Sequence, residues 1–213
     1  MPGYVADVMT YNVVAVPQTA EFKDIVEVMR RRQVSAFPVI DADNRVIGVI
    51  SEADLLPREA YPHRPAAYPH ERRRRVPAKA EAFTAAELMT SPAITITADT
   101  SVPDAAKMMY SNRVKRLPVV DEDSHLIGIV SRVDLLGIYD RPDAEICEEI
   151  TEEVIAGDFV LDPSEFTVTV SRGVVTITGR VERQEVALSL LQAVWDVAGV
   201  VDVRDRLTYP VRH

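Results

Sequence analysis

Two short stretches with the same layout decide the fold: GVISEADL at residues 48–55 and GIVSRVDL at residues 128–135. In each stretch a glycine opens an apolar run, and a serine follows three residues before an aspartate. The matching positions are Gly48, Ser51 and Asp54 in the first stretch and Gly128, Ser131 and Asp134 in the second. Each pair is separated by 80 residues, which indicates an internal repeat.

The same offset relates residues far outside these two stretches. Met9-Thr10 recurs as Met89-Thr90, Phe37-Pro38-Val39 recurs as Leu117-Pro118-Val119, and Asp41 and Asp43 recur as Asp121 and Asp123. We therefore predict two repeats, at residues 1–56 and 81–140, joined by a linker at residues 57–80. A third unit, at residues 143–210, has no counterpart within the duplication.

The hydrophobic spacing in each repeat predicts the order strand, helix, strand, strand, helix. The expected elements of the first repeat are a strand at 13–16, a helix at 19–33 with Thr19 as its N-cap, strands at 36–41 and 45–50, and a helix that begins at Ser51. Neither repeat has enough elements to cover its own sheet. We therefore expect the two repeats to pack together as one module.

The linker differs in composition from both repeats. Residues 57–79 include five prolines, and their seven basic and two acidic side chains give a net charge of +5. Prolines with few aliphatic residues predict an irregular, exposed segment. Four consecutive arginines, Arg72 to Arg75, and the histidines His63 and His70 raise the alternative of a phosphate or metal site, but a solvated loop is the favoured interpretation because charge runs usually face water.

The C-terminal unit predicts an acidic α+β domain. Residues 143–158 form an amphipathic acidic pattern, and two alternating runs flank Arg172-Gly173, which predicts a hairpin turn. Residues 183–199 predict a helix ended by Gly199, and a last strand follows, so the order is αββαβ. Fourteen acidic and six basic side chains give residues 143–213 a net charge of −8.

The Ser-x-x-Asp pattern has two interpretations. As local structure it is a capping box, in which Ser51 or Ser131 begins a helix and the aspartate binds a free backbone N–H. As a functional element, the same hydroxyl and carboxylate lie at a helix N-terminus, where backbone donors favour an anion such as phosphate. The sequence leaves both interpretations open.

The duplicated unit resembles a tandem pair of cystathionine-β-synthase (CBS) domains, a Bateman module, through the repeated Met-Thr, Pro-Val and Gly-x-x-Ser-x-x-Asp motifs. Residues 143–210 resemble a BON domain through their αββαβ order and the segments RGVVTITGRV and VAGVVDVRDRL. The CBS resemblance implies clefts between the repeats that bind adenosine-containing ligands such as AMP, ADP, ATP or NAD-type nucleotides. The whole chain is then an α+β protein.

The resemblance also implies roles for particular residues. Asp54 and Asp134 would accept the ribose hydroxyls, and Ser51 and Ser131 would lie near phosphate. Apolar residues of the first strands would form walls for the base, and the residues before each Pro-Val pair would line the clefts; these are Val14, Val16, Ile94 and Ile96 for the walls, and Ser35, Ala36, Lys115 and Arg116 for the lining. Since only the second pair is cationic, we expect the two clefts to differ.

These features together predict a regulatory ligand-sensing protein. The sequence shows no nucleophile–base pair, metal cluster or glycine-rich phosphate loop, so we expect no catalytic activity and no metal. Cys147 is the only cysteine, which excludes an intramolecular disulfide. We expect a homodimer formed through helical apolar faces such as Val26/Met29 and Met108/Met109, and a protein partner of unknown identity.

Charge and hydropathy limit the possible partners and the location of the protein. The net charge of −9 argues against a nucleic-acid partner, which requires a basic face. The start of the sequence, MPGYVADVMT, lacks the basic and apolar regions of a secretory signal, so we expect a cytoplasmic location. The alternative is an adaptor attached to phospholipid through the BON-like domain. The acidic charge of that domain disfavours docking on anionic lipid.

Overall fold

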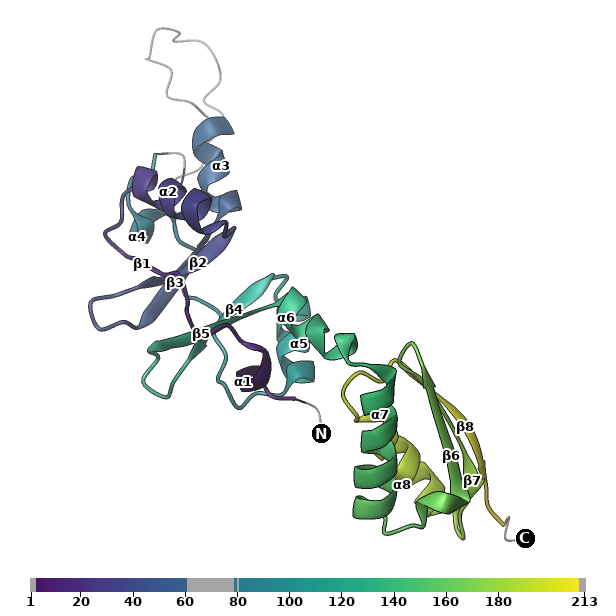
Figure 1. Ribbon diagram of the computed structural model, residues 1–213. Coiled ribbons are helices and arrows are strands. Elements are labelled where there is room, and N and C mark those ends of the chain that lie inside the picture. Colours follow the sequence, from purple (N-terminus) through teal and green to yellow (C-terminus); the bar gives the residue numbers. More distant parts are fainter. Residues whose placement is uncertain (1–2, 61–78, 80, 211–213) are drawn as a thin grey trace, which may run out of the picture. The chain divides into compact units, whose positions relative to one another are not determined.

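The computed structural model describes residues 3–60, 79 and 81–210 (Figure 1). Most of the predicted linker, including Arg72 to Arg75 and both histidines, lies outside the described residues. Contacts divide the chain into two units, one of residues 1–8, 100–112 and 132–213 and the other of residues 9–99 and 113–131. Among the described residues, no helix combines the length and the apolar character needed to cross a bilayer.

The unit of residues 9–99 and 113–131 contains the sheets of both repeats. In the first sheet, β1 (Val16–Pro17) pairs in parallel with β2 (Ala36–Ile40), which pairs antiparallel with β3 (Val46–Ser51). The first strand is shorter than the predicted 13–16 strand and begins at Val16. Four of the five β2 residues are buried, as their continuous apolar run predicts.

The second repeat reproduces this register 80 residues later. Strand β4 (Arg116–Val120) pairs antiparallel with β5 (Leu126–Ser131), and a register shift after Val119 matches the one after Val39 in the first repeat. Ile96 forms a parallel bridge with Val119, in the place that β1 has in the first repeat. The duplication in sequence is thus a duplication of hydrogen-bonding pattern.

The repeated Met-Thr motif joins the two repeats to each other. Thr90 exchanges two backbone hydrogen bonds with Val49 of β3, at 2.9 and 3.1 Å, and Thr10 does the same with Ile129 of β5, at 2.9 and 3.0 Å. Each methionine lies against the glycine of the opposite repeat: a Cβ at Gly48 would lie 2.4 Å from the sulfur of Met89. Glycine is favoured there because a side chain would force the methionine to move.

The core of the first repeat also draws on both repeats. The helix α2 (Phe22–Arg32) buries Ile25 and Met29 against the sheet. The short helix α4 (Ala85–Leu88) adds Ala85 and Leu88 to the same cluster, although its sequence precedes the strands of the second repeat. The two repeats therefore share this core.

Two local expectations for the first repeat were wrong. Helix α2 has Glu21 as its N-cap without a side-chain capping bond, so Thr19 is not the cap. Helix α3 (Glu52–Ala60) continues through Pro57 into the predicted linker. Arg58 holds this last turn, since its guanidinium lies 4.8 Å from the ring of Phe22 and 4.6 Å from the ring of Phe83.

The other unit contains the remaining helices of the CBS-like part. These are α1 (Val5–Val8), α5 (Val102–Ser111), α6 (Arg132–Leu136) and the 3₁₀ turn η2 (Gly137–Asp140). Ser101 caps α5, because its hydroxyl oxygen accepts a hydrogen bond from the backbone N–H of Asp104 at 3.2 Å. Val102, Ala105 and Met109 form the buried face of α5.

The C-terminal domain has the predicted αββαβ order. The elements are α7 (Asp143–Glu149), which continues as the π-helical segment η3 (Ile150–Asp158), a 3₁₀ turn η4 (Pro163–Glu165), strands β6 (Phe166–Ser171) and β7 (Val174–Arg180), helix α8 (Gln184–Trp195) and strand β8 (Asp202–Thr208). The hairpin β6–β7 is antiparallel, and β8 lies parallel to β7. Both helices cover one face of this sheet (Figure 1).

The hairpin turn of this domain is tied to the start of its first helix. The carboxylate of Asp143 accepts the backbone N–H groups of Arg172 and Gly173, at 2.7 and 2.8 Å. Both turn residues have positive φ, at 52° and 73°, which confirms the predicted turn. The predicted end of α8 was wrong: the helix ends at Trp195, and Gly199, at φ 94°, lies in the connection to β8.

Candidate functional site

A cavity of about 520 Å³ lies in the unit that holds both sheets. Both repeats contribute to its walls; the lining residues are Ser35, Ala36, Val49, Ser51, Glu52, Ala53, Asp54, Leu56, Thr90, Pro92, Ala93, Ile94, Arg113, Val114, Lys115 and Arg116. This volume is within the range of small-molecule sites, about 300–1,000 Å³. The lining combines apolar surface with a few charged groups, which is the usual composition of such a site.

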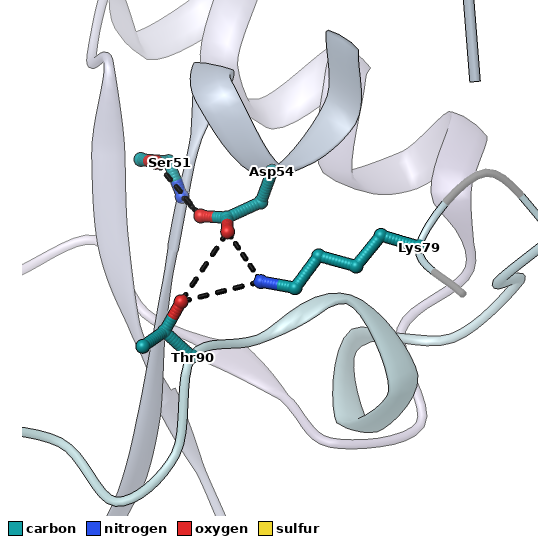
Figure 2. A network of polar contacts seen from close by, with 4 residues as sticks. All are labelled: Ser51, Asp54, Lys79 and Thr90. Atoms are coloured by element: carbon teal, nitrogen blue, oxygen red, sulfur yellow. Dashed lines mark hydrogen bonds and ion pairs between the residues drawn. The ribbon is translucent and has the colours of Figure 1, made fainter. Parts of the chain in front are cut away.

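Asp54 is the centre of a polar network at this cavity (Figure 2). One carboxylate oxygen accepts the backbone N–H of Ser51 at 2.8 Å and the Ser51 hydroxyl at 2.7 Å. The other oxygen accepts the ammonium of Lys79 and, at 3.3 Å, the hydroxyl of Thr90. Lys79 also donates to the Thr90 hydroxyl at 3.2 Å, which closes the triangle seen in Figure 2.

This network fixes the charge of Asp54. Partial burial by itself would raise the pKa of Asp54, but the hydrogen bonds from Lys79 and Ser51 outweigh burial and hold the pKa below its ordinary value of 3.8. The aspartate is therefore ionised at neutral pH. Its side chain is only 14% exposed and that of Lys79 is 29% exposed, so bulk water screens this ion pair incompletely.

Three cations line the same cavity. Arg116 is anchored, because its guanidinium donates to the backbone oxygen of Ala36 at 2.9 Å and to the hydroxyl of Ser35 at 3.0 Å. Arg113 and Lys115 are exposed and take part in none of the ion pairs within the described part of the chain. The cavity thus has a carboxylate held by local donors and a cationic rim able to bind an anion.

The structure brings seven of the twelve predicted site residues to this cavity; they are Ser35, Ala36, Ser51, Asp54, Ile94, Lys115 and Arg116. The residues before both Pro-Val pairs therefore line the same cavity. From the sequence we had expected them to line two clefts that differ in charge. Val16 and Ile96 are 4% exposed and belong to the buried core, and Val14 packs against it. These three predicted walls are absent from the lining formed by the described residues.

The second Ser-x-x-Asp pair occupies equivalent places in the secondary structure. Ser131 is the last residue of β5, and Asp134 lies in the first turn of α6. Both make polar interactions of their own. Their assignment to a nucleotide site remains a prediction.

Sequence reasoning missed four polar residues at the site: Glu52, Lys79, Thr90 and Arg113. The segment RVKR, which begins at Arg113, carries a cluster of charge that would have indicated that residue. Thr90 was recognised only as part of a repeated motif. The sequence around Lys79 gave no indication of its contact with Asp54, because the two residues are 25 positions apart.

The family profile of the CBS domain matches residues 5–60 and 85–141, which together make up more than half of the chain. The chain is a CBS-domain protein. The profile of the BON domain matches residues 142–210, so a BON domain follows the two CBS domains. Both findings confirm the resemblance and the α+β fold expected from the motifs.

Relatives of this CBS-domain protein differ widely in size. An uncharacterized protein of Methanocaldococcus jannaschii, MJ1426, is 31% identical over 150 residues, which cover 62% of this chain and 88% of the relative. Inosine-5'-monophosphate dehydrogenase of Halobacterium salinarum is 33% identical over 119 residues, 56% of this chain. The match spans only 20% of the dehydrogenase.

Two solved structures of CBS pairs are similar in fold to the CBS part of this chain. CBSX2, whose crystal structure is a complex with AMP, is 26% identical with a TM-score of 0.51, over 63% of this chain and 93% of that chain. The CBS pair of MJ0100 superposes with a TM-score of 0.54 at 18% identity, over 66% of this chain and 98% of that one. At that identity the second likeness shows the fold alone.

Proposed function

We propose that this CBS-domain protein binds a phosphorylated adenosine nucleotide in the cavity beside Asp54 and acts as a non-catalytic regulator of a protein partner. The observation that carries the proposal is that the carboxylate of Asp54, apolar side chains and three cations line one cavity. A single adenosine nucleotide has groups complementary to all three. We further propose that the protein acts in the cytoplasm.

The chemistry of each part of the cavity supports this ligand class. The Asp54 carboxylate is an acceptor for vicinal ribose hydroxyls. Val49, Leu56 and Ile94 offer apolar surface for a flat base. Arg113, Lys115 and Arg116 supply positive charge, which favours phosphates over neutral nucleosides; hydrogen bonds between charged groups are the stronger kind.

The AMP complex of CBSX2 supports AMP as the first nucleotide to test. A titration calorimetry panel of adenosine, AMP, ADP, ATP and NAD against the full chain would rank the ligands. We expect Lys115→Ala to weaken AMP binding about five- to thirtyfold, in line with about 1–2 kcal/mol for one charge-assisted hydrogen bond, and to leave adenosine binding unchanged. Lys107→Ala, on the exposed part of α5 outside the cavity lining, is the matched control.

Two results would overturn the proposal. One is that no adenosine nucleotide binds at millimolar concentration, and the other is that Lys115→Ala weakens adenosine as much as AMP. The second result would mean that the cationic rim does not bind the phosphate. Arg116 is a less suitable test residue, because its bonds to Ser35 and Ala36 also join the two repeats.

We also propose a homodimer, with a corrected surface. Of the faces named from the sequence, Met29 and Met109 are 8% and 1% exposed and belong to the core, whereas Val26 and Met108 are only partly buried. Large exposed apolar side chains instead occur on α5 and α6, where Tyr110 is 85%, Val133 76% and Leu136 60% exposed. Light scattering should give the dimer mass at micromolar concentration, and Tyr110→Glu with Val133→Glu should shift it to the monomer.

A further inference from the structure

The carboxylate of Asp54 has no hydrogen-bonding capacity to spare. A carboxylate offers about four lone-pair sites. The backbone N–H and the hydroxyl of Ser51 use one oxygen, and Lys79 and Thr90 use the other. Two ribose hydroxyls cannot be added to this carboxylate unless present donors leave it.

The donors differ in how readily they can leave. Ser51 is three residues from Asp54, and its backbone N–H is fixed by the start of α3. The Thr90 hydroxyl lies 3.3 Å from the carboxylate and can rotate away at little cost. Lys79 is the donor that carries charge, and its long side chain can withdraw into water because it is already 29% exposed.

We infer that Lys79 is an internal competitor of the nucleotide: its ammonium occupies the ribose acceptor Asp54, and ligand binding displaces it. This inference rests on the proposed function and adds a regulatory residue to that site. Breaking the ion pair lowers the net affinity for every ligand that uses Asp54. A ligand must therefore gain more from the rest of the cavity, and phosphates beside Arg113 and Lys115 provide that gain.

The displacement also gives ligand binding an effect outside the cavity. Lys79 belongs in sequence to the connection between the two repeats, whereas Asp54 and Thr90 belong to the repeats themselves. In the free protein one ammonium thus joins three separate parts of the chain (Figure 2). In the liganded protein that ammonium is released. The solvent accessibility of Lys79 therefore depends on whether the cavity is occupied.

The first test compares Lys79→Met with Lys23→Met by calorimetry with AMP, in the full chain. Methionine keeps the length of the side chain and removes its charge, and Lys23, on α2, is far in sequence from the network and absent from the cavity lining. We expect Lys79→Met to bind AMP about three- to thirtyfold tighter than wild type, since a partly buried charged hydrogen bond no longer competes. Lys23→Met should bind as wild type does.

Equal or weaker AMP binding by Lys79→Met would overturn the inference and leave the proposed function intact. If neither wild type nor Lys79→Met binds AMP, both the proposed function and the inference fail.

The second test follows the displacement itself. Lysine acetylation by a water-soluble acetylating reagent, read by mass spectrometry, should be slower at Lys79 than at Lys23 in the free protein. Saturation with AMP should increase labelling at Lys79 and decrease it at Lys115, with Lys23 unchanged. Labelling of Lys79 that falls or stays constant with AMP would show that the ammonium remains in place, and would refute the displacement.

Discussion

The Asp54–Lys79 ion pair is the interaction whose strength can be predicted most directly. Replacing Asp54 with Asn removes the charge and leaves one acceptor oxygen for donors that now occupy two. Because hydrogen bonds to charged groups contribute about 1.5–3 kcal/mol, we expect the free energy of unfolding to fall by about 2 kcal/mol at pH 7. Lys79→Met should cost less, about 1 kcal/mol, since Asp54 keeps both bonds from Ser51.

A double-mutant cycle isolates the pair from these other effects. Exposed ion pairs typically couple by about 0.2–1 kcal/mol. The Asp54 side chain is 14% exposed and that of Lys79 is 29% exposed, so we expect a coupling above this range, about 1–1.5 kcal/mol. The assay is urea unfolding of wild type, both single variants and the double variant, followed by far-ultraviolet circular dichroism.

The pH dependence supplies an independent check on the same residue. The pKa of Asp54 in the folded protein lies below 3.8, so its ionisation stabilises the fold above that pH, and this contribution is lost as pH falls through the folded pKa. The difference in stability between wild type and Asp54→Asn should thus be constant from neutral pH to about pH 5 and shrink below about pH 4. A coupling under about 0.3 kcal/mol, or a stability difference that does not depend on acid pH, would refute the reasoning.

Three further outcomes are expected. Gly48→Ala should destabilise the CBS part by about 1–3 kcal/mol in urea unfolding, because the new Cβ would lie 2.4 Å from the sulfur of Met89, and adding Met89→Ala should restore part of that loss. Asp143→Ala should lower the stability of the BON domain by about 1–3 kcal/mol in calorimetric scanning and leave the CBS transition unchanged, since it removes the acceptor of two backbone N–H groups at the hairpin turn. The full chain should co-sediment weakly with anionic vesicles at physiological salt, because residues 143–213 carry a net charge of −8; strong co-sedimentation would favour the phospholipid adaptor instead.

The duplication, the α+β class and most of the secondary structure can be predicted from the sequence alone. These features are local or periodic: alternation predicts strands, helical spacing predicts helices, and an offset of 80 residues predicts a second copy of the same register. The sequence also predicted the turn at Arg172-Gly173, because a tight turn depends on the conformational preferences of neighbouring residues. Helix boundaries were predicted less well: α3 continues through Pro57, where Arg58 contacts the rings of Phe22 and Phe83, and α8 ends at Trp195, before Gly199.

The surroundings of the Ser-x-x-Asp motif in the first repeat depend on tertiary contacts that the motif does not predict. Ser51 and Asp54 bond each other as a local cap, and the same carboxylate lines a cavity whose cations come from the second repeat. The reason is that each repeat inserts its Met-Thr segment beside the strand of the other, which brings together residues far apart in sequence. No periodicity records such a contact, so the roles of Lys79 and Thr90 at this cavity could be found only in the folded chain.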